Sequence, residues 1–175
     1  MRSAKRLTTI SVLVALATVL HIIEALFPNP FPIPGVKLGL ANIITLMALV
    51  IFDFKTVLQI VVLRILLGSL LSGTFLSTGF FLSFSGALAS TCIMAFLQKV
   101  LSGFSLIGIS VAGAAAHNLG QLAMAAFLIA HVGIFFYLPI MLFSSIPTGI
   151  ITGLMLQFVL KYLKSSGQLD RLSSS

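Results

Sequence analysis

Long apolar stretches with almost no charged residues constrain the fold of this chain more than any other feature. Hydrophobic types make up 59% of the 175 residues, and charged types make up only 7%. A water-soluble globular domain has roughly 25% charged residues, so this chain cannot cover itself with polar groups. We therefore expect lipid to solvate it, as one integral membrane domain over residues 1–175.

The apolar stretches predict an all-α, polytopic fold with about six membrane spans. A spanning helix needs about 20 residues to cross roughly 30 Å of hydrocarbon. The second and third stretches are short for this, whereas the sixth is long enough to tilt and contains predicted kinks at Pro139 and Pro147. The predicted spans are about 7–27, 36–52, 56–72, 78–101, 105–130 and 134–163, with a cytoplasmic tail over 165–175.

The positions of the lysines and arginines predict the orientation of these spans in the cell membrane. On a six-span arrangement, Lys37 alone falls in an outer loop, Arg64 falls within a span, and the other basic residues share one side. The positive-inside rule then places both termini in the cytoplasm. Basic residues spread over chain ends and short gaps differ from the solvated patch of a nucleic-acid binder, so we expect no nucleic-acid partner. The shared side holds Arg2, Lys5, Arg6, Lys55, Lys99, Lys161, Lys164 and Arg171.

Small residues recur in three spans at the spacing of helix-packing motifs. Such residues let helix backbones approach closely. Two interpretations stay open, namely packing within the bundle and docking of another membrane subunit. The residues are Ser11 and Ala15 in the first span, Ala112, Ala116 and Gly120 in the fifth, and Gly149 and Gly153 in the sixth.

A proline-rich segment in the first outer loop precedes the second span. Prolines at every second position over 28–34 predict a stiff, extended segment, either a cover for a cavity mouth or a rigid connector. Pro34 before Gly35 predicts a helix start, which places Lys37 in the first helical turn. The helix dipole disfavours a cation there unless an anion binds between the lysine and the free N–H groups. Alternatively, Lys37 reaches outward to the lipid headgroups.

Polar residues within the spans form the candidate ligand site. Arg64 lies near the middle of the third span, where an arginine costs about 2.5–3.5 kcal/mol on insertion scales, so it should face the bundle interior. His117 and Gln121, four residues apart, share a face of the fifth span. The polar residues form either a structural network that locks the bundle or a ligand pocket in the outer half of the membrane. The candidate binding residues are Glu24, Lys37, Asn42, Arg64, His117, Asn118 and Gln121.

The charges of this set predict the chemistry of the ligand. Two positive groups, on Lys37 and Arg64, against one carboxylate, on Glu24, favour a ligand with an anionic end and an apolar body. Glu24 would either pair with Arg64 or meet a cationic part of the ligand. We expect the pocket between the first, second, third and fifth spans, under the proline-rich segment.

Catalysis and cofactor binding are not predicted. The chain has three acidic residues, none paired, and its three histidines lack metal-ligand spacing. The single cysteine, Cys92, lies in an apolar stretch and cannot form an internal disulfide. We expect no catalytic residue, metal or cofactor. Since no nucleotide-hydrolysing motif is complete, active transport would need a partner or an ion gradient.

Three motifs resemble the Gx transporter family, which is also known as heptaprenyl diphosphate synthase component I. They are residues 34–43 (PGVKLGLANI), 63–70 (LRILLGSL) and 116–121 (AHNLGQ). The resemblance covers nearly the whole chain. The family is similar to the substrate-binding S components of energy-coupling factor (ECF) transporters, six-helix membrane proteins that capture a vitamin-like ligand near the outer face.

The resemblance implies partners as well as a fold. S components work with a transmembrane coupling subunit and two ATPases, and their first helix often presents small residues to that subunit, which Ser11 and Ala15 match loosely. Some family members resemble components of flavin-based extracellular electron transfer systems. The alternative function is therefore a non-transporting membrane subunit of a redox or prenyl-quinone assembly. Synthase activity itself is not expected, since prenyl diphosphate synthases resemble soluble enzymes with paired aspartate-rich Mg²⁺ sites.

Overall fold

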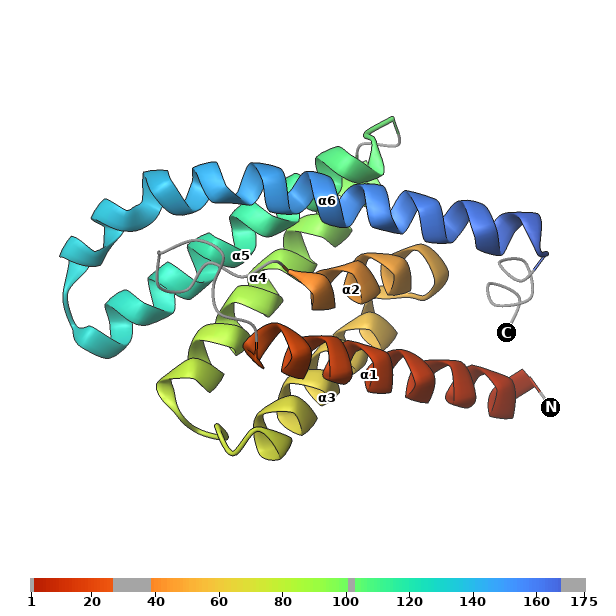
Figure 1. Cartoon of the computed structure of the whole chain (residues 1–175), viewed down its shortest axis with the longest axis horizontal. Coiled ribbons are helices and arrows are strands. Elements are labelled where there is room, and N and C mark those ends of the chain that lie inside the picture. Colours follow the sequence, from red (N-terminus) through yellow and green to blue (C-terminus); the bar gives the residue numbers. More distant parts are fainter. Residues whose placement is uncertain (1, 27–38, 101–102, 168–175) are drawn as a thin grey trace.

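The computed structural model describes residues 2–26, 39–100 and 103–167, and within these ranges the chain is helical and contains no strand (Figure 1). The prediction of an all-α fold is confirmed. The elements are α1 (Arg2–Leu26), α2 (Leu40–Ile51), α3 (Phe54–Leu71), α4 (Thr78–Val100), α5 (Leu106–Ile129), the 3₁₀ helix η1 (Val132–Tyr137) and α6 (Leu138–Ser165).

Helix length and the outer surface identify a multi-pass membrane protein. In the described ranges, five segments are long and apolar enough to cross a bilayer, and they correspond to α1, α3, α4, α5 and η1 with α6. Large apolar side chains cover the outside of the bundle, including Phe127, Phe136 and Phe158, which are at least 79% exposed. An exposed apolar surface of this kind is solvated by lipid.

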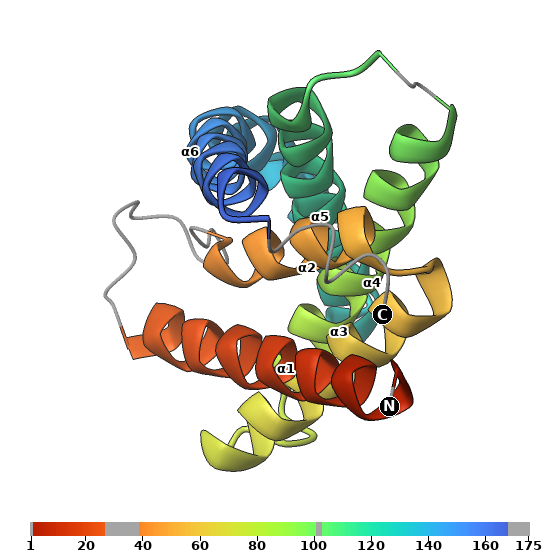
Figure 2. The same ribbon diagram turned by 90° about the vertical axis from the view of Figure 1, so that its right-hand side faces the viewer.

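The short helix α2 lies at the centre of the bundle, with α1 and α6 on opposite sides of it (Figure 2). Ile44 and Ala48 join the apolar core formed with α1, α3 and α4, whereas Ile43 and Leu46 join a second core with α4, α5 and α6. A helix that is apolar on all sides is stable when it is surrounded by protein. The helical part of the predicted 36–52 span begins only at Leu40 and has 12 residues, too few to cross the bilayer.

Local side-chain contacts explain where several helices begin. Asp53 caps α3 by accepting a hydrogen bond from the Thr56 N–H, and Ser105 caps α5 by accepting one from the Gly108 N–H. Pro139 lies in the first turn of α6, where a proline leaves no hydrogen bond unmade, so the kink expected there is wrong. Pro147 lies within α6, as its predicted span implies.

Glycines set the close approach of α4, α5 and α6. A Cβ atom on Gly149 would collide with the backbone of Val111, and one on Gly153 would lie 2.7 Å from the Cα atom of Ile107. A Cβ atom on Gly120 would lie 2.9 Å from the carbonyl oxygen of Ser85. These glycines therefore pack helices within the bundle. Ser11 and Ala15, in contrast, lie on the exposed side of α1.

The beginning of α1 and the end of α6 lie at the same end of the bundle (Figure 1). At this end Arg6 of α1 forms an ion pair with Asp53 at 2.6 Å and donates to the Thr56 hydroxyl at 2.9 Å. Its guanidinium also lies 5.8 Å from the centre of the Phe52 ring. These contacts fix the start of α1 to the turn between α2 and α3.

Candidate ligand-binding site

Four of the seven predicted binding residues line one small pocket, which we call the polar pocket. They are Glu24 from α1, Asn42 from α2, Arg64 from α3 and His117 from α5. The pocket has a volume of about 20 Å³, room for one or two water molecules. Its full lining is His21, Glu24, Gly39, Ala41, Asn42, Arg64, Ile65, Ser83, Ala87 and His117.

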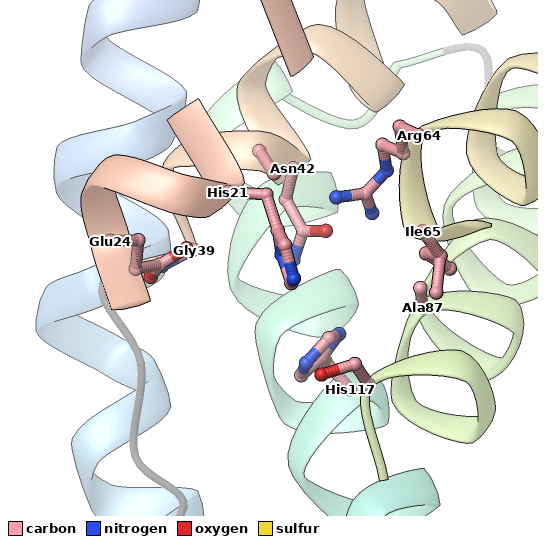
Figure 3. Close-up of a pocket in the computed structure, with 10 residues that line it drawn as sticks. His21, Glu24, Gly39, Asn42, Arg64, Ile65, Ala87 and His117 are labelled. Carbon is pink, nitrogen blue, oxygen red and sulfur yellow. The ribbon is translucent and has the colours of Figure 1, made fainter. Parts of the chain in front are cut away.

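Arg64 brings a positive charge into the interior of the bundle. Its side chain is only 2% exposed, and its Nε atom is buried without a hydrogen-bond partner. Figure 3 shows the guanidinium pointing into the pocket, toward Asn42 and His21. A buried cation of this kind is costly unless an anion or several acceptors meet it. The prediction that Arg64 faces the bundle interior agrees with this geometry.

Glu24 fixes the start of α2. Its carboxylate accepts a hydrogen bond from the backbone N–H of Gly39, the residue before the helix. Gly39 has a φ angle of +74°, a left-handed conformation that glycine adopts without strain. In Figure 3 Glu24 lies beside Gly39, and His21 lies between it and Arg64. Glu24 and Arg64 line the same pocket, and whether Glu24 pairs with Arg64 or meets a cationic part of the ligand stays a prediction.

His21, three residues before Glu24 on α1, also lines the polar pocket but was not among the predicted binding residues. A Cβ atom on Gly68 would lie 2.8 Å from the His21 Cδ2 atom, so the imidazole packs directly on the α3 backbone. Gly68 follows Arg64 by one helical turn, and this pattern of small residue after arginine was visible in the sequence. Gly39 and Ser83 are also part of the lining; Gly39 lies within the motif at 34–43, whereas no sequence signal marked Ser83.

Asn118 belongs to a second polar pocket, which shares Gly39, Asn42 and His117 with the first. Its side-chain amide donates to the Met141 carbonyl oxygen at 2.7 Å and so joins α5 to α6. Asn118 is therefore engaged in helix packing. The other polar residues here, Ser110, Thr148 and Thr152, were not predicted, although the four-residue spacing of Ser144, Thr148 and Thr152 on α6 was a usable signal.

Gln121 lies away from the polar pocket and lines a larger hollow, which we call the apolar cavity. The cavity has a volume of about 390 Å³ and lies between α4, α5, η1 and α6. Gln121 is 4% exposed, and its Oε1 atom is buried without a hydrogen-bond partner. The lining is Thr78, Leu82, Gln121, Leu122, Ala125, Leu128, Ile129, Ile134, Tyr137 and Met141.

The seventh predicted residue, Lys37, and the proline-rich segment before it lie outside the described residues. The amino end of α2, whose N–H groups were predicted to assist Lys37, begins at Leu40 and lies at the polar pocket through Gly39 and Ala41. Within the described residues, no three His, Cys, Asp or Glu side chains are placed to hold a metal ion.

Comparison with known proteins gives one family. The family model for heptaprenyl diphosphate synthase component I matches residues 13–159, which include every residue that lines the polar pocket. No curated protein and no solved structure matches the chain. Because the family model covers most of the sequence, the chain belongs to the heptaprenyl diphosphate synthase component I family.

Proposed function

We propose that this protein is a substrate-binding membrane subunit, similar to an ECF S component, for uptake of a small ligand with an anionic group. The ligand is a vitamin-like molecule or a precursor of an isoprenoid or quinone, and a separate coupling subunit with ATPases supplies the energy. The membership of the family and the helical membrane fold are consistent with such a component. In this function the protein binds and releases its ligand without changing it chemically.

The observation that carries the proposal is Arg64. A buried arginine within a spanning helix is expensive, and its Nε atom is without a hydrogen-bond partner. The amino end of α2 lies at the same pocket, and a carboxylate, that of Glu24, already accepts the Gly39 N–H there. Cationic side chain and helix end both favour an anion at one place. A purely structural network would leave the Nε atom of Arg64 an unexplained cost.

The name of the family favours a second candidate. "Component I" of a synthase describes one subunit of an assembly, so a non-transporting membrane subunit of a prenyl-quinone or redox assembly is the alternative. The chain itself offers little for diphosphate chemistry. Of its three acidic residues, Asp53 caps α3 and pairs with Arg6, and Glu24 accepts from Gly39. Any synthase activity would therefore belong to a partner chain.

Native mass spectrometry of the protein purified in mild detergent tests the binding function. We expect a retained small molecule on the natural chain and its loss from Arg64→Gln, with Lys164→Gln on the exposed end of α6 as the charge-matched control. If Arg64→Gln folds poorly, Arg64→Lys keeps the charge but loses the planar donors, and it should retain less of the molecule. Equal retention by Arg64→Gln and the natural chain would contradict the proposal.

Co-purification distinguishes the two candidate functions. An S component should bring down a transmembrane coupling subunit and ATPases, whereas a subunit of a prenyl-quinone or redox assembly should bring down soluble enzymes or electron carriers. Repeated recovery of the second group without the first would favour the alternative.

A further inference from the structure

The apolar cavity is the feature of the structure that the proposed function does not yet use. The polar pocket and the second polar pocket have volumes of only about 20 Å³ each, enough for the end group of a ligand. The apolar cavity, at about 390 Å³, falls within the range of roughly 300–1,000 Å³ that ligand sites occupy. We propose that this cavity binds the apolar body of an amphipathic ligand whose anionic end lies in the polar pocket. This inference rests on the proposed function.

Side chains of α5 connect the two places. His117 lines the polar pocket, and Gln121, one turn further along α5, lines the apolar cavity. Both lie against the same glycine of α4. A Cβ atom on Gly86 would lie 2.8 Å from the Gln121 Cγ atom and 3.0 Å from the His117 Nε2 atom. The step from the polar to the apolar region is therefore one helical turn along a single helix face.

Gln121 marks the polar end of the apolar cavity. Its side chain is only 4% exposed, and its Oε1 atom has no hydrogen-bond partner. A buried acceptor without a donor costs free energy, and an apolar hollow left unfilled also costs free energy. A ligand with a hydroxyl or amide N–H group between its charged end and its apolar body would satisfy both. This sets the chemical class as an amphipathic acid with a donor near its middle.

The far walls of the cavity suit a hydrocarbon chain or ring. Leu122 and Met141 are buried and pack together there, and the partly exposed Tyr137 of η1 also lines the cavity. Asn118 fixes the position of Met141 by donating to its carbonyl oxygen. A lipid acyl chain has the same apolar chemistry as the proposed ligand body, so the experiment must separate these two sources.

The chain provides its own optical reporter, because it has two tyrosines and no tryptophan. Tyr137 lines the cavity, and Tyr162 lies near the opposite end of α6. We would replace Tyr162 with Phe, reconstitute the protein in lipid nanodiscs, and titrate it with 6-bromohexanoate, whose bromine quenches nearby tyrosine. We expect saturable quenching of Tyr137 and at least tenfold weaker binding of the neutral analogue 6-bromohexanol. The protein carrying Tyr137→Phe and only Tyr162 should show no saturation.

Two alanines of α5 provide the matched variants. Ala125 lines the cavity, and Ala123 lies on the exposed side of the same helix. Ala125→Phe should abolish saturation and Ala125→Val should weaken it, whereas Ala123→Phe should leave it unchanged. Unfolding temperatures show whether each variant is folded. Saturation that survives in folded Ala125→Phe, or quenching that rises linearly and equally for both tyrosines, would overturn the proposal and leave lipid chains as the occupant.

The failure of the proposed function gives a different result. If 6-bromohexanoate and 6-bromohexanol bind equally and Arg64→Gln changes neither, the cavity binds apolar groups while the anion site is refuted. If Arg64→Gln weakens the acid alone and Ala125→Phe abolishes saturation for both probes, the polar and apolar parts act as one site.

Discussion

At the scale of single residues, Asp53 holds together the ends of three helices. Its carboxylate caps α3 through Thr56, pairs with Arg6 of α1 and lies directly after the last turn of α2. The Thr56 hydroxyl and N–H, and then the Arg6 guanidinium, hold the pKa of Asp53 below its ordinary value of 3.8. Both partners of the ion pair are well exposed, so most of the stability that Asp53 contributes comes from its cap of α3.

Two substitutions of Asp53 distinguish the stability contributed by its capping hydrogen bond from the stability contributed by its charge. We expect Asp53→Ala to lose about 1 kcal/mol of stability, or roughly 2–4 °C in unfolding temperature, because the first turn of α3 loses its acceptor. Asp53→Asn should lose less, since asparagine also caps well. Ser105→Ala, which removes the α5 cap without an ion pair, is the control and should resemble Asp53→Ala. Circular dichroism melts in detergent measure all three, and equal losses for Asn and Ala would show that the charge dominates.

The lowered pKa of Asp53 also predicts an acid dependence. A carboxyl whose pKa is lower in the folded state adds stability above its unfolded value, 3.8, and this contribution disappears as pH falls through the folded pKa. The natural chain should therefore exceed Asp53→Asn in unfolding temperature at pH 6, and the difference should shrink toward pH 3. A difference that stays constant across this range would contradict the contribution of the ionised carboxylate.

Sequence and structure agree unevenly at the residue scale. Arg64 could be placed inside the bundle from sequence because a charged side chain within a membrane span is too costly to face lipid. The contact of Glu24 with Gly39 could not be predicted, since it depends on the left-handed backbone of one glycine and on how α1 meets α2. Asn118 is adjacent to His117 in sequence but points toward α6, because adjacent helix positions differ by about 100°. Gln121 shares a face with His117 but lies one turn further along α5, which places it at the apolar cavity.

At the scale of elements, the contact of α5 with α6 depends on glycines without side chains. Gly149→Ala should destabilise the protein by about 1–3 kcal/mol, because the new methyl group meets the backbone of Val111, which cannot move aside cheaply. Gly79→Ala in the first turn of α4 is the matched control, since its nearest neighbour, Ser77 Oγ, would lie at an ordinary 3.6 Å. That change should be neutral or slightly stabilising. Thermal unfolding of both variants measures the contrast, and equal effects would contradict close packing as the cause.

The exposed side of α1 is the expected surface for a coupling subunit. Ala15→Leu should weaken assembly with such a partner, because a small-residue face gains its energy from close backbone approach, while ligand retention should persist. Ala123→Leu on the exposed side of α5 adds the same bulk elsewhere and should assemble normally. Pull-down yield measures assembly. Normal assembly of Ala15→Leu would remove α1 as the docking surface.

Helix boundaries were predictable where a polar cap interrupts the apolar sequence and not elsewhere. Asp53 and Ser105 mark the starts of α3 and α5, which lie within two residues of the predicted spans. The start of α2 was placed at residue 36 because Pro34 and Gly35 resemble a helix start, but the helix begins at Leu40, after the left-handed Gly39. Nothing in the apolar sequence 43–51 distinguishes a central buried helix from a spanning one.

At the scale of the whole molecule, the arrangement of basic residues predicts how the bundle is oriented. Single-cysteine labelling tests this after Cys92→Ser removes the natural thiol. Thr74→Cys in the turn between α3 and α4 should react with an impermeant maleimide on intact cells, whereas Ser166→Cys beyond α6 should react only after permeabilisation. Both positions are exposed. Reaction of both from the same side would refute the six-span orientation.

The length of α2 has an electrical consequence for the membrane around it. Twelve residues rise about 18 Å, whereas the hydrocarbon layer is roughly 30 Å thick. Because α2 ends beside the exposed Asp53 at the basic end of the bundle, we expect its amino end to lie within the insulating layer. The positive potential of that helix end comes from the peptide dipoles and carries no proton to lose. The attraction of this helix end for a negative group is therefore permanent, and the dipole contribution to it does not vary with pH.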